Sequence, residues 1–253
     1  PPSVKLVDLR KLRVGMTMAE VLEIFPGPIE TKISPRDTTV WQYRFAELYF
    51  RDGLLFNCAF TTNPKCAPSR ASILTGRHTW QNRECCLHIN HWPDDLPVYT
   101  DYLIDAGYHV GFTGKPWAPG DWKRSGRTQN PAGTAYNEHT LTPPEGSAIG
   151  NCDYAENFRS FLADRDADQP FCFWYGAREP HRAYAFGEGQ RHGKQLDEVK
   201  EIPPYWPQED VIRADMLDYA FEIEWFDKQL GRIVDILTEA GELDNTLVIV
   251  TSD

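Results

Sequence analysis

The stretch CAPSRASILTGR at residues 66–77 is the part of the chain from which the fold and the site can be predicted. Pro68 suits the first turn of a helix and Gly76 suits the far end, so the stretch predicts a helix start followed by a defined stop. Cys66 then lies just ahead of the helix N-terminus, where backbone N–H groups and the helix dipole favour an anion. Arg70 adds a permanently charged guanidinium fork that suits a tetrahedral oxyanion. The segment therefore predicts an anion site around Cys66.

The rest of this part of the chain alternates between apolar strands and helices. Residues 108–113, 170–175 and 246–251 are short apolar runs typical of strands. Residues 216–237 repeat apolar side chains at three- and four-residue steps, which predicts a long amphipathic helix that Gly241 ends. This alternation predicts an α/β fold, a partial doubly wound and mostly parallel sheet flanked by helices.

The first 53 residues have a different pattern. Residues 19–25 predict a short helix, and residues 40–50 mix aromatic and polar side chains in the manner of one or two strands. The sequence thus predicts a small α+β segment at residues 1–53, followed by a separate α/β domain at residues 54–253.

Composition excludes several classes of partner. The chain has 253 residues and a net charge of −11 without a long basic run, so nucleic acid and anionic membranes are poor partners. We expect no transmembrane helix, because no apolar stretch is long enough, and the N-terminus lacks the pattern of a signal peptide. The spacing of the six cysteines predicts neither a zinc site nor a disulfide framework.

The string C-x-P-S-R, followed by Thr75-Gly76, resembles the signature of the sulfatase family. The resemblance implies an alkaline-phosphatase-like fold. It also implies that a formylglycine-generating enzyme oxidises Cys66 to formylglycine, whose hydrate is a diol. One hydroxyl attacks sulfur and the other later loses its proton to expel sulfate, while a divalent cation, usually calcium, activates the diol. The alternative for Cys66 is a structural cysteine on a capped helix.

Two further motifs match this family after predicted strands. Lys115, in Gly114-Lys115-Pro116-Trp117, matches the lysine that reaches a sulfate oxygen, although Trp117 stands where many members have a histidine. His181, in Glu179-Pro180-His181, matches a histidine that contacts sulfate and is a candidate acid for the leaving oxygen. We therefore expect Cys66, Arg70, Lys115 and His181 to be catalytic, with His78 as a further substrate contact.

The expected metal site is incomplete in this sequence. Asp253 matches a metal-binding aspartate, and Cys66 after modification is the other expected ligand. Family members open with a strand that ends in a metal-binding Asp-Asp pair, but the one such pair here, Asp94-Asp95, follows the cysteine in a loop. The asparagine expected after Asp253 is also missing. We therefore expect an incomplete sulfatase domain with weak calcium binding and impaired turnover. It is either joined near Gly53 to unrelated sequence or part of a genuine two-module protein.

Finer resemblances concern the substrate and the N-terminal segment. Residues 62–66, 180–182 and 202–207 are similar to heparan N-sulfatases, which implies a sulfated sugar such as a glycosaminoglycan as substrate. The same resemblance implies a periplasmic, secreted or lysosomal location. Residues 5–53 loosely resemble outer-membrane assembly lipoproteins of the SmpA/OmlA kind.

Three other functions stay open at this point. One is a phosphodiester or phosphonate hydrolase of the alkaline phosphatase superfamily, some of whose members use formylglycine. A second is a sulfatase-like module without catalysis. The third, a cysteine hydrolase, requires a histidine next to Cys66, and no motif places one there.

Overall fold

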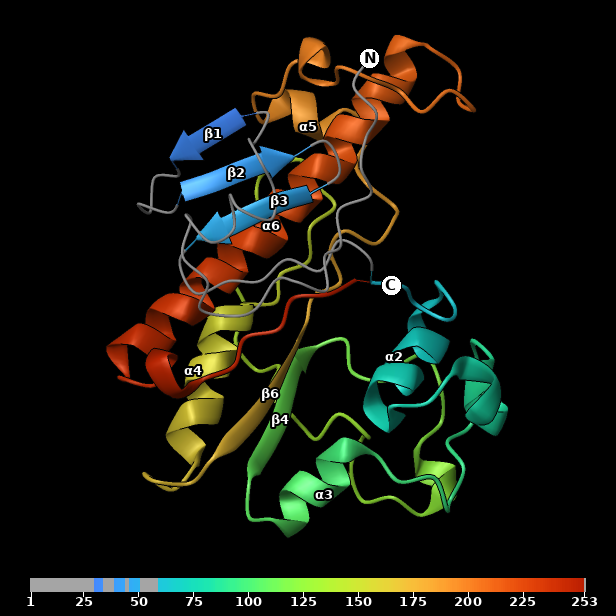
Figure 1. Ribbon diagram of the computed structural model, residues 1–253, viewed down its shortest axis with the longest axis vertical. Helices are drawn as coiled ribbons and strands as arrows, with labels where there is room; N and C mark the ends of the chain where they lie inside the picture. The colour runs from blue at the N-terminus through green and yellow to red at the C-terminus, as the bar shows by residue number, and fades with distance from the viewer. Residues whose placement is uncertain (1–29, 34–38, 44–45, 51–58, 253) are drawn as a thin grey trace, which may run out of the picture. The chain divides into compact units, whose positions relative to one another are not determined.

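The computed structural model describes residues 30–33, 39–43, 46–50 and 59–252 (Figure 1). The chain divides into two compact units, Pro1–Phe60 and Thr61–Asp253. In the first unit, β1 (Glu30–Ile33), β2 (Thr39–Tyr43) and β3 (Ala46–Phe50) form an antiparallel sheet in the order β1-β2-β3. Residues 40–50 thus contain two strands, while the helix predicted at 19–25 lies outside the described residues.

The second unit is built on a parallel sheet. Its strands are β4 (His109–Gly114), β5 (Thr134–Ala135) and β6 (Phe171–Gly176), in the order β5-β4-β6. Its helices are α2 (Cys66–Thr75), α3 (Tyr99–Asp105), α4 (Tyr154–Asp164), α5 (Glu188–Arg191) and α6 (Asp210–Glu239). The 3-10 turns are η2 (Thr79–Gln81), η3 (Arg83–Cys86), η4 (Lys123–Ser125), η5 (Leu196–Glu198) and η6 (Leu243–Asn245). Two of the three predicted strands are confirmed as β4 and β6, which pair side by side in register (Figure 1).

Both faces of this sheet are covered, because successive side chains of a strand point to opposite faces. On β6, Phe171, Phe173 and Tyr175 pack against a buried cluster formed by α4 and α6. Trp174 points the other way and packs against the cluster that contains Ala67, Ala71 and Leu74 of α2. The predicted α/β fold with helices on both faces of a parallel sheet is confirmed, and it brings the start of α2 near the ends of β4 and β6.

The long helix α6 is confirmed, but its buried face differs from the predicted one in its first half. Tyr219 and Ile223, predicted to be buried, are 44% and 40% exposed. Asp218 and Glu222 are instead almost fully buried. Asp218 accepts hydrogen bonds from the backbone N–H groups of Gly187 (2.8 Å) and Gly189 (2.9 Å), so its burial does not leave it without partners. Side-chain polarity alone therefore misplaced the core face.

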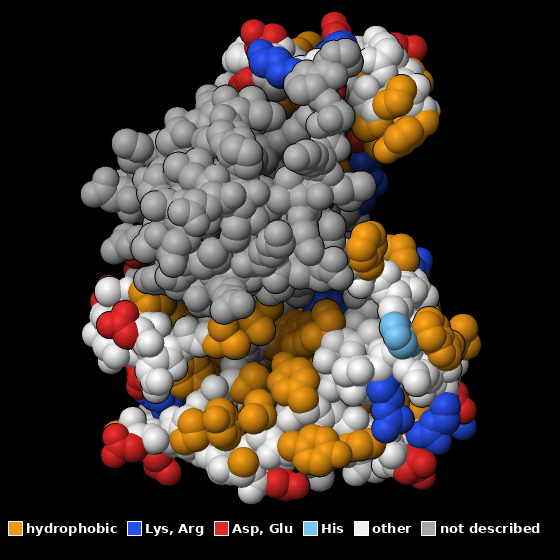
Figure 2. Space-filling model, in the orientation of Figure 1, with side chains coloured by type: hydrophobic (Ala, Val, Ile, Leu, Met, Phe, Trp, Pro, Cys, Tyr) orange, Lys and Arg blue, Asp and Glu red, His pale blue; other side chains and the backbone are white. Residues whose placement is uncertain are grey.

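The strand predicted at residues 246–251 is wrong. These residues form no strand, and the side chains of Leu247 and Ile249 are 84% and 75% exposed. A strand needs a neighbour for its N–H and C=O groups, and among the described strands β6 pairs only with β4. Figure 2 shows apolar side chains gathered on the drawn face over β4 and β6. The β-branched composition of 246–251 predicted a strand, but the segment has no partner strand in the part that the structure describes.

Candidate functional site

The helix predicted at this stretch is confirmed, but Cys66 is the first residue of α2 and does not lie just ahead of it, because Lys65 is the residue before the first turn. The helix ends at Gly76, whose φ of 65° is a left-handed conformation that glycine adopts readily. The Cys66 thiol is half-buried, and its Sγ lies 2.9 Å from Nε2 of His88. A histidine that the sequence analysis left unassigned is therefore in direct contact with the predicted nucleophile.

The ring of His88 is also influenced by other predicted site residues. Its pKa is lowered, first by burial and then by the positive charges of Lys65, Lys115 and His181. These charges act on the His88 ring because they lie near it. Cys66 therefore contacts His88 directly, and Lys115 and His181 lie close enough to influence the charge of the same ring.

Arg70 holds the end of β4 in place. Its Nη1 donates to the backbone carbonyl of Lys115 at 2.7 Å, and its guanidinium lies 5.7 Å from the ring centre of Trp174 on β6. The backbone N–H of Lys115 in turn donates to the carbonyl of Gly176 at 2.5 Å. Arg70 therefore links α2 to the ends of both central strands, a contact the sequence did not predict.

His181 lies on the exposed loop after β6. Its backbone N–H donates to the carbonyl of Arg178 at 2.8 Å, and its Nδ1 lies 2.5 Å from the carbonyl of Arg182. Because Nδ1 is occupied by this carbonyl, Nε2 is the ring atom that can face a bound group. Since a carbonyl only accepts, Nδ1 carries the hydrogen, so Nε2 accepts in the neutral ring and donates a proton only when the ring is protonated.

Other predicted residues are not brought to this place. His78 stacks on Trp80, with ring centres 4.4 Å apart, and no described contact joins it to Cys66. Asp253 lies outside the described residues. Trp117, at the position where relatives of the sulfatase type often have histidine, is 1% exposed and packs edge-on against Trp92. The imidazole nearest Cys66 thus comes from residue 88 and not from residue 117.

No sequence signal singled out His88. It follows Cys66 by 22 residues, and its position depends on η3, which packs against α2 and turns the chain back toward Cys66. The only hint was the local density of histidines, at positions 88 and 91, downstream of the signature.

The described residues do not fit a calcium ion. Among residues 59–252, no group of three His, Cys, Asp or Glu side chains is placed to hold a metal. The charges that act on His88, beside Cys66, come from Lys65, Lys115 and His181, which repel a cation. The described residues alone therefore do not assemble a calcium site.

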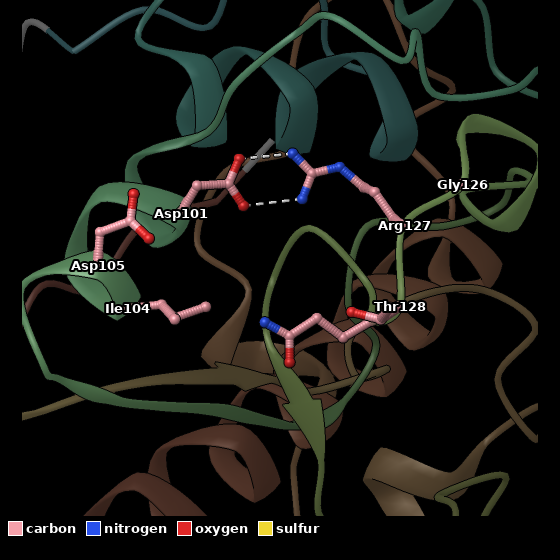
Figure 3. Close-up of a pocket in the computed structure, with 7 residues that line it drawn as sticks. Asp101, Ile104, Asp105, Gly126, Arg127 and Thr128 are labelled. Carbon is pink, nitrogen blue, oxygen red and sulfur yellow. Dashed lines mark hydrogen bonds and ion pairs between the residues drawn. The ribbon is translucent and has the colours of Figure 1, made fainter.

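A hollow elsewhere on the second unit contains none of the predicted site residues (Figure 3). Asp101 of α3 and Arg127 face each other across it in a bidentate ion pair. Nη1 of Arg127 donates to Oδ1 of Asp101 at 2.8 Å, and Nη2 donates to Oδ2 at 2.6 Å. Arg127 also contacts the carbonyl of Leu96 and lies over the ring of Trp92. These contacts give both charged groups partners within the fold, so the ion pair in this hollow has a structural role and does not indicate a ligand site.

Comparison with known proteins identifies the class. The family model of the sulfatases matches residues 33–253. This match covers most of the chain, so the chain belongs to the sulfatase family, a family of hydrolases that act on sulfate esters or sulfamates. Within the described residues, no helix combines the length and apolar character that a membrane crossing requires.

Several curated relatives carry sulfatase names. Human N-sulphoglucosamine sulphohydrolase is 31% identical over 80% of this chain and 44% of the relative. An ulvan-active sulfatase of Formosa agariphila is 27% identical over 80% of this chain and 38% of the relative. The chain thus spans less than half the length of these relatives. A candidate sulfatase of Bacteroides fragilis, yidJ, shares the fold with a TM-score of 0.54 and 19% identity, covering 77% of this chain and 52% of that one.

Two predictions concern the N-terminal segment, its resemblance to outer-membrane lipoproteins and its boundary at residue 53. The SmpA/OmlA resemblance is unsupported, and the sulfatase match begins at residue 33, inside that segment. The predicted domain boundary at residue 53 stays a prediction, because the sulfatase match crosses it and the compact units divide after Phe60.

Proposed function

We propose that the chain is a sulfatase acting on sulfated sugars, with formylglycine made from Cys66 as its nucleophile. The contact of Cys66 with His88 at the N-terminus of α2, together with the hydrogen bond from Arg70 of the same helix to the carbonyl of Lys115, is the observation that carries this proposal. Such a cluster of cationic and neutral donors suits an anion with several oxygens. The name of the human relative, N-sulphoglucosamine sulphohydrolase, supports an N-sulfated amino sugar as substrate.

The residues take separate roles in this proposal. Formylglycine supplies a hydrated aldehyde whose oxygen attacks sulfur and which later releases sulfate. The Lys115 ammonium neutralises a sulfate oxygen, and Arg70 fixes the Lys115 backbone through its carbonyl. His181 donates a proton from Nε2 to the leaving sugar oxygen or nitrogen. His78 stays a candidate substrate contact.

The remaining requirements are proposed from the family. A formylglycine-generating enzyme must convert Cys66. A divalent cation, calcium in the proposal, requires further ligands such as Asp253, because the described residues contain no group of three candidate ligands. A periplasmic, secreted or lysosomal location agrees with a Drosophila melanogaster relative named as an extracellular sulfatase, 24% identical over 79% of this chain.

One observation favours a second candidate function, a cysteine hydrolase. The 2.9 Å separation between Cys66 Sγ and His88 Nε2 is the geometry of a thiol paired with a base. Under this alternative Cys66 stays a thiol and a thiolate attacks the substrate. The experiment below separates the two.

The test uses the 253-residue chain produced with and without a formylglycine-generating enzyme. Peptide mass spectrometry measures the fraction of residue 66 converted to aldehyde, and hydrolysis of an aryl sulfate is measured beside that of an aryl phosphodiester. We expect sulfate release to rise in proportion to the converted fraction and to exceed phosphodiester hydrolysis. Activity of the unconverted chain that iodoacetamide abolishes would instead support the cysteine hydrolase. Faster phosphodiester hydrolysis would support the related phosphodiesterase.

Replacing His88 tests its contact with residue 66. We expect His88→Ala to lower kcat for the aryl sulfate by about 10- to 100-fold, because one hydrogen bond to the reacting side chain, of about 1.5–3 kcal/mol, is lost. His88→Gln should recover part of the loss, since its amide nitrogen reaches close to the position of Nε2. His192→Ala, whose ring stacks on Phe221, is the control and should retain activity. Equal rates for His88→Ala and His192→Ala would contradict the role.

A further inference from the structure

Tyr154 connects α4 to the loop that carries His181. Its side chain is fully buried at the first position of α4. Its hydroxyl donates to the carboxylate of Glu179 at 2.7 Å and accepts from the backbone N–H of Arg178 at 3.2 Å. Burial, followed by the nearby charge of Glu179, raises the pKa of Tyr154, so the phenol keeps the proton that it donates.

Glu179 completes the connection. It is 5% exposed, and its second carboxylate oxygen accepts from the backbone N–H of Gly150 at 3.0 Å. A buried carboxylate with two fixed donors is held in one position. The carbonyl of the neighbouring Arg178 accepts from the backbone N–H of His181, so fixing residues 178 and 179 also fixes the backbone of His181.

The ring of Tyr154 also supports the end of β4. A Cβ added to Gly114 would lie 2.8 Å from Cε1 of Tyr154, which places the ring against the residue before Lys115. The same ring meets Tyr175 of β6 with ring centres 5.2 Å apart. One side chain therefore contacts the ends of both strands that carry the proposed sulfate-binding residues.

We propose that Tyr154 and Glu179 are positioning residues that fix the backbone of His181, in the loop after β6, in the geometry that sulfate-bond cleavage requires. The inference rests on the proposed sulfatase function. Neither residue needs to touch the substrate, because both act through the backbone of residues 178–181. A small displacement of His181 reduces proton transfer more than it reduces binding, so the effect belongs in kcat.

The main test compares two tyrosines in the converted chain, Tyr154, which is buried, and Tyr175, which is half-buried. Tyr154→Phe removes only the hydroxyl, and we expect kcat for the aryl sulfate to fall by about 10- to 100-fold with KM changed by less than about threefold. Tyr175→Phe is the matched control, because its hydroxyl donates to the carbonyl of Phe226 on α6 and not to the loop. Its kcat should stay within about twofold of the wild type.

A second substitution tests whether the two residues act as a unit. Glu179→Gln keeps the shape of the side chain but presents an NH2 group to one of its two donors, so we expect a similar loss of kcat. The kcat of the double variant Tyr154→Phe/Glu179→Gln should be no lower than that of the less active single variant, because either single substitution already breaks the contact. Losses that multiply would overturn the idea of one shared network.

Hydrogen exchange separates this inference from the proposed function. We expect exchange in a peptide covering residues 178–182 to be faster in Tyr154→Phe than in the wild type, and unchanged in Tyr175→Phe. Unchanged exchange in Tyr154→Phe overturns the inference whatever the activity. Faster exchange with unaltered kcat overturns the positioning role. If the converted wild type releases no sulfate, the proposed function fails, and faster exchange still supports Tyr154 as the residue that holds the loop.

Discussion

Gly176→Ala is expected to lower the free energy of unfolding by about 3 kcal/mol or more. The new Cβ would overlap the backbone carbonyl oxygen of Lys115 and lie 2.9 Å from its carbon. The obstacle is backbone, so no flexible side chain can move aside. The two strand ends cannot separate either, because the N–H of Lys115 donates to the carbonyl of Gly176 at 2.5 Å.

Urea unfolding of Gly176→Ala and Gly107→Ala measures this effect against a matched substitution. Gly107 has a φ of 88° but open space around its Cβ position. Its replacement therefore costs only the left-handed backbone penalty of about 1–2 kcal/mol. Equal destabilisation by the two variants would show that the ends of β4 and β6 separate easily. The same clash should displace Lys115, so sulfate release should fall further in Gly176→Ala than in Gly107→Ala.

The parts of this fold that the sequence predicted depend on local pattern. Pro68 and Gly76 mark the ends of α2, and the apolar runs of β4 and β6 lie between turn residues, so neighbours along the chain determine them. Residues 246–251 have an equally clear pattern and form no strand. A strand also needs a partner, and the sequence of one segment does not say whether its partner is in place.

A motif can predict a site residue from its neighbours along the chain. A contact between segments that are far apart in the sequence cannot be predicted in this way. Short motifs predict roles for Cys66, Lys115 and His181, and these roles stay predictions. His88 reaches Cys66 only because η3 turns the chain back onto α2, and Tyr154 reaches Glu179 across 25 residues. Nothing in the spacing of a tyrosine and a glutamate reveals such a contact, because it depends on how α4 packs beside β4 and β6.

Glu222→Gln is expected to remove a large part of the pH dependence of stability. Glu222 is 2% exposed on α6 and faces Glu188 of α5, Glu179 after β6, and Tyr184. Burial, followed by the charges of Glu188 and Glu179, raises the pKa of Glu222 to about 8. The two oxygens of the Glu188 carboxylate accept from the N–H groups of Ala148 (2.8 Å) and Ala185 (3.1 Å), and a carboxylate supplies no donor that could stabilise an ionised Glu222.

The sign of the effect follows from proton binding. An unfolded chain loses the Glu222 proton near pH 4.3, while the folded chain keeps it until about pH 8, so the folded state binds more protons in between. The contribution of protonated Glu222 to the free energy of unfolding is therefore fully present below about pH 4.3, and it is lost as the pH rises to about 8. At 1.36 kcal/mol for each pKa unit, this loss is on the order of 3–5 kcal/mol.

Urea unfolding at several pH values between 5 and 9 compares the wild type with Glu222→Gln. A glutamine is neutral throughout, so the variant should keep its stability at high pH and exceed the wild type above pH 8. Asp235→Asn, an exposed change on the same helix, should retain the wild-type slope. Parallel curves for wild type and Glu222→Gln would mean that Glu222 is ionised in the fold. Because the N–H groups of Ala148 and Gly150 bond Glu188 and Glu179, ionising Glu222 should also loosen the segment that holds the His181 loop.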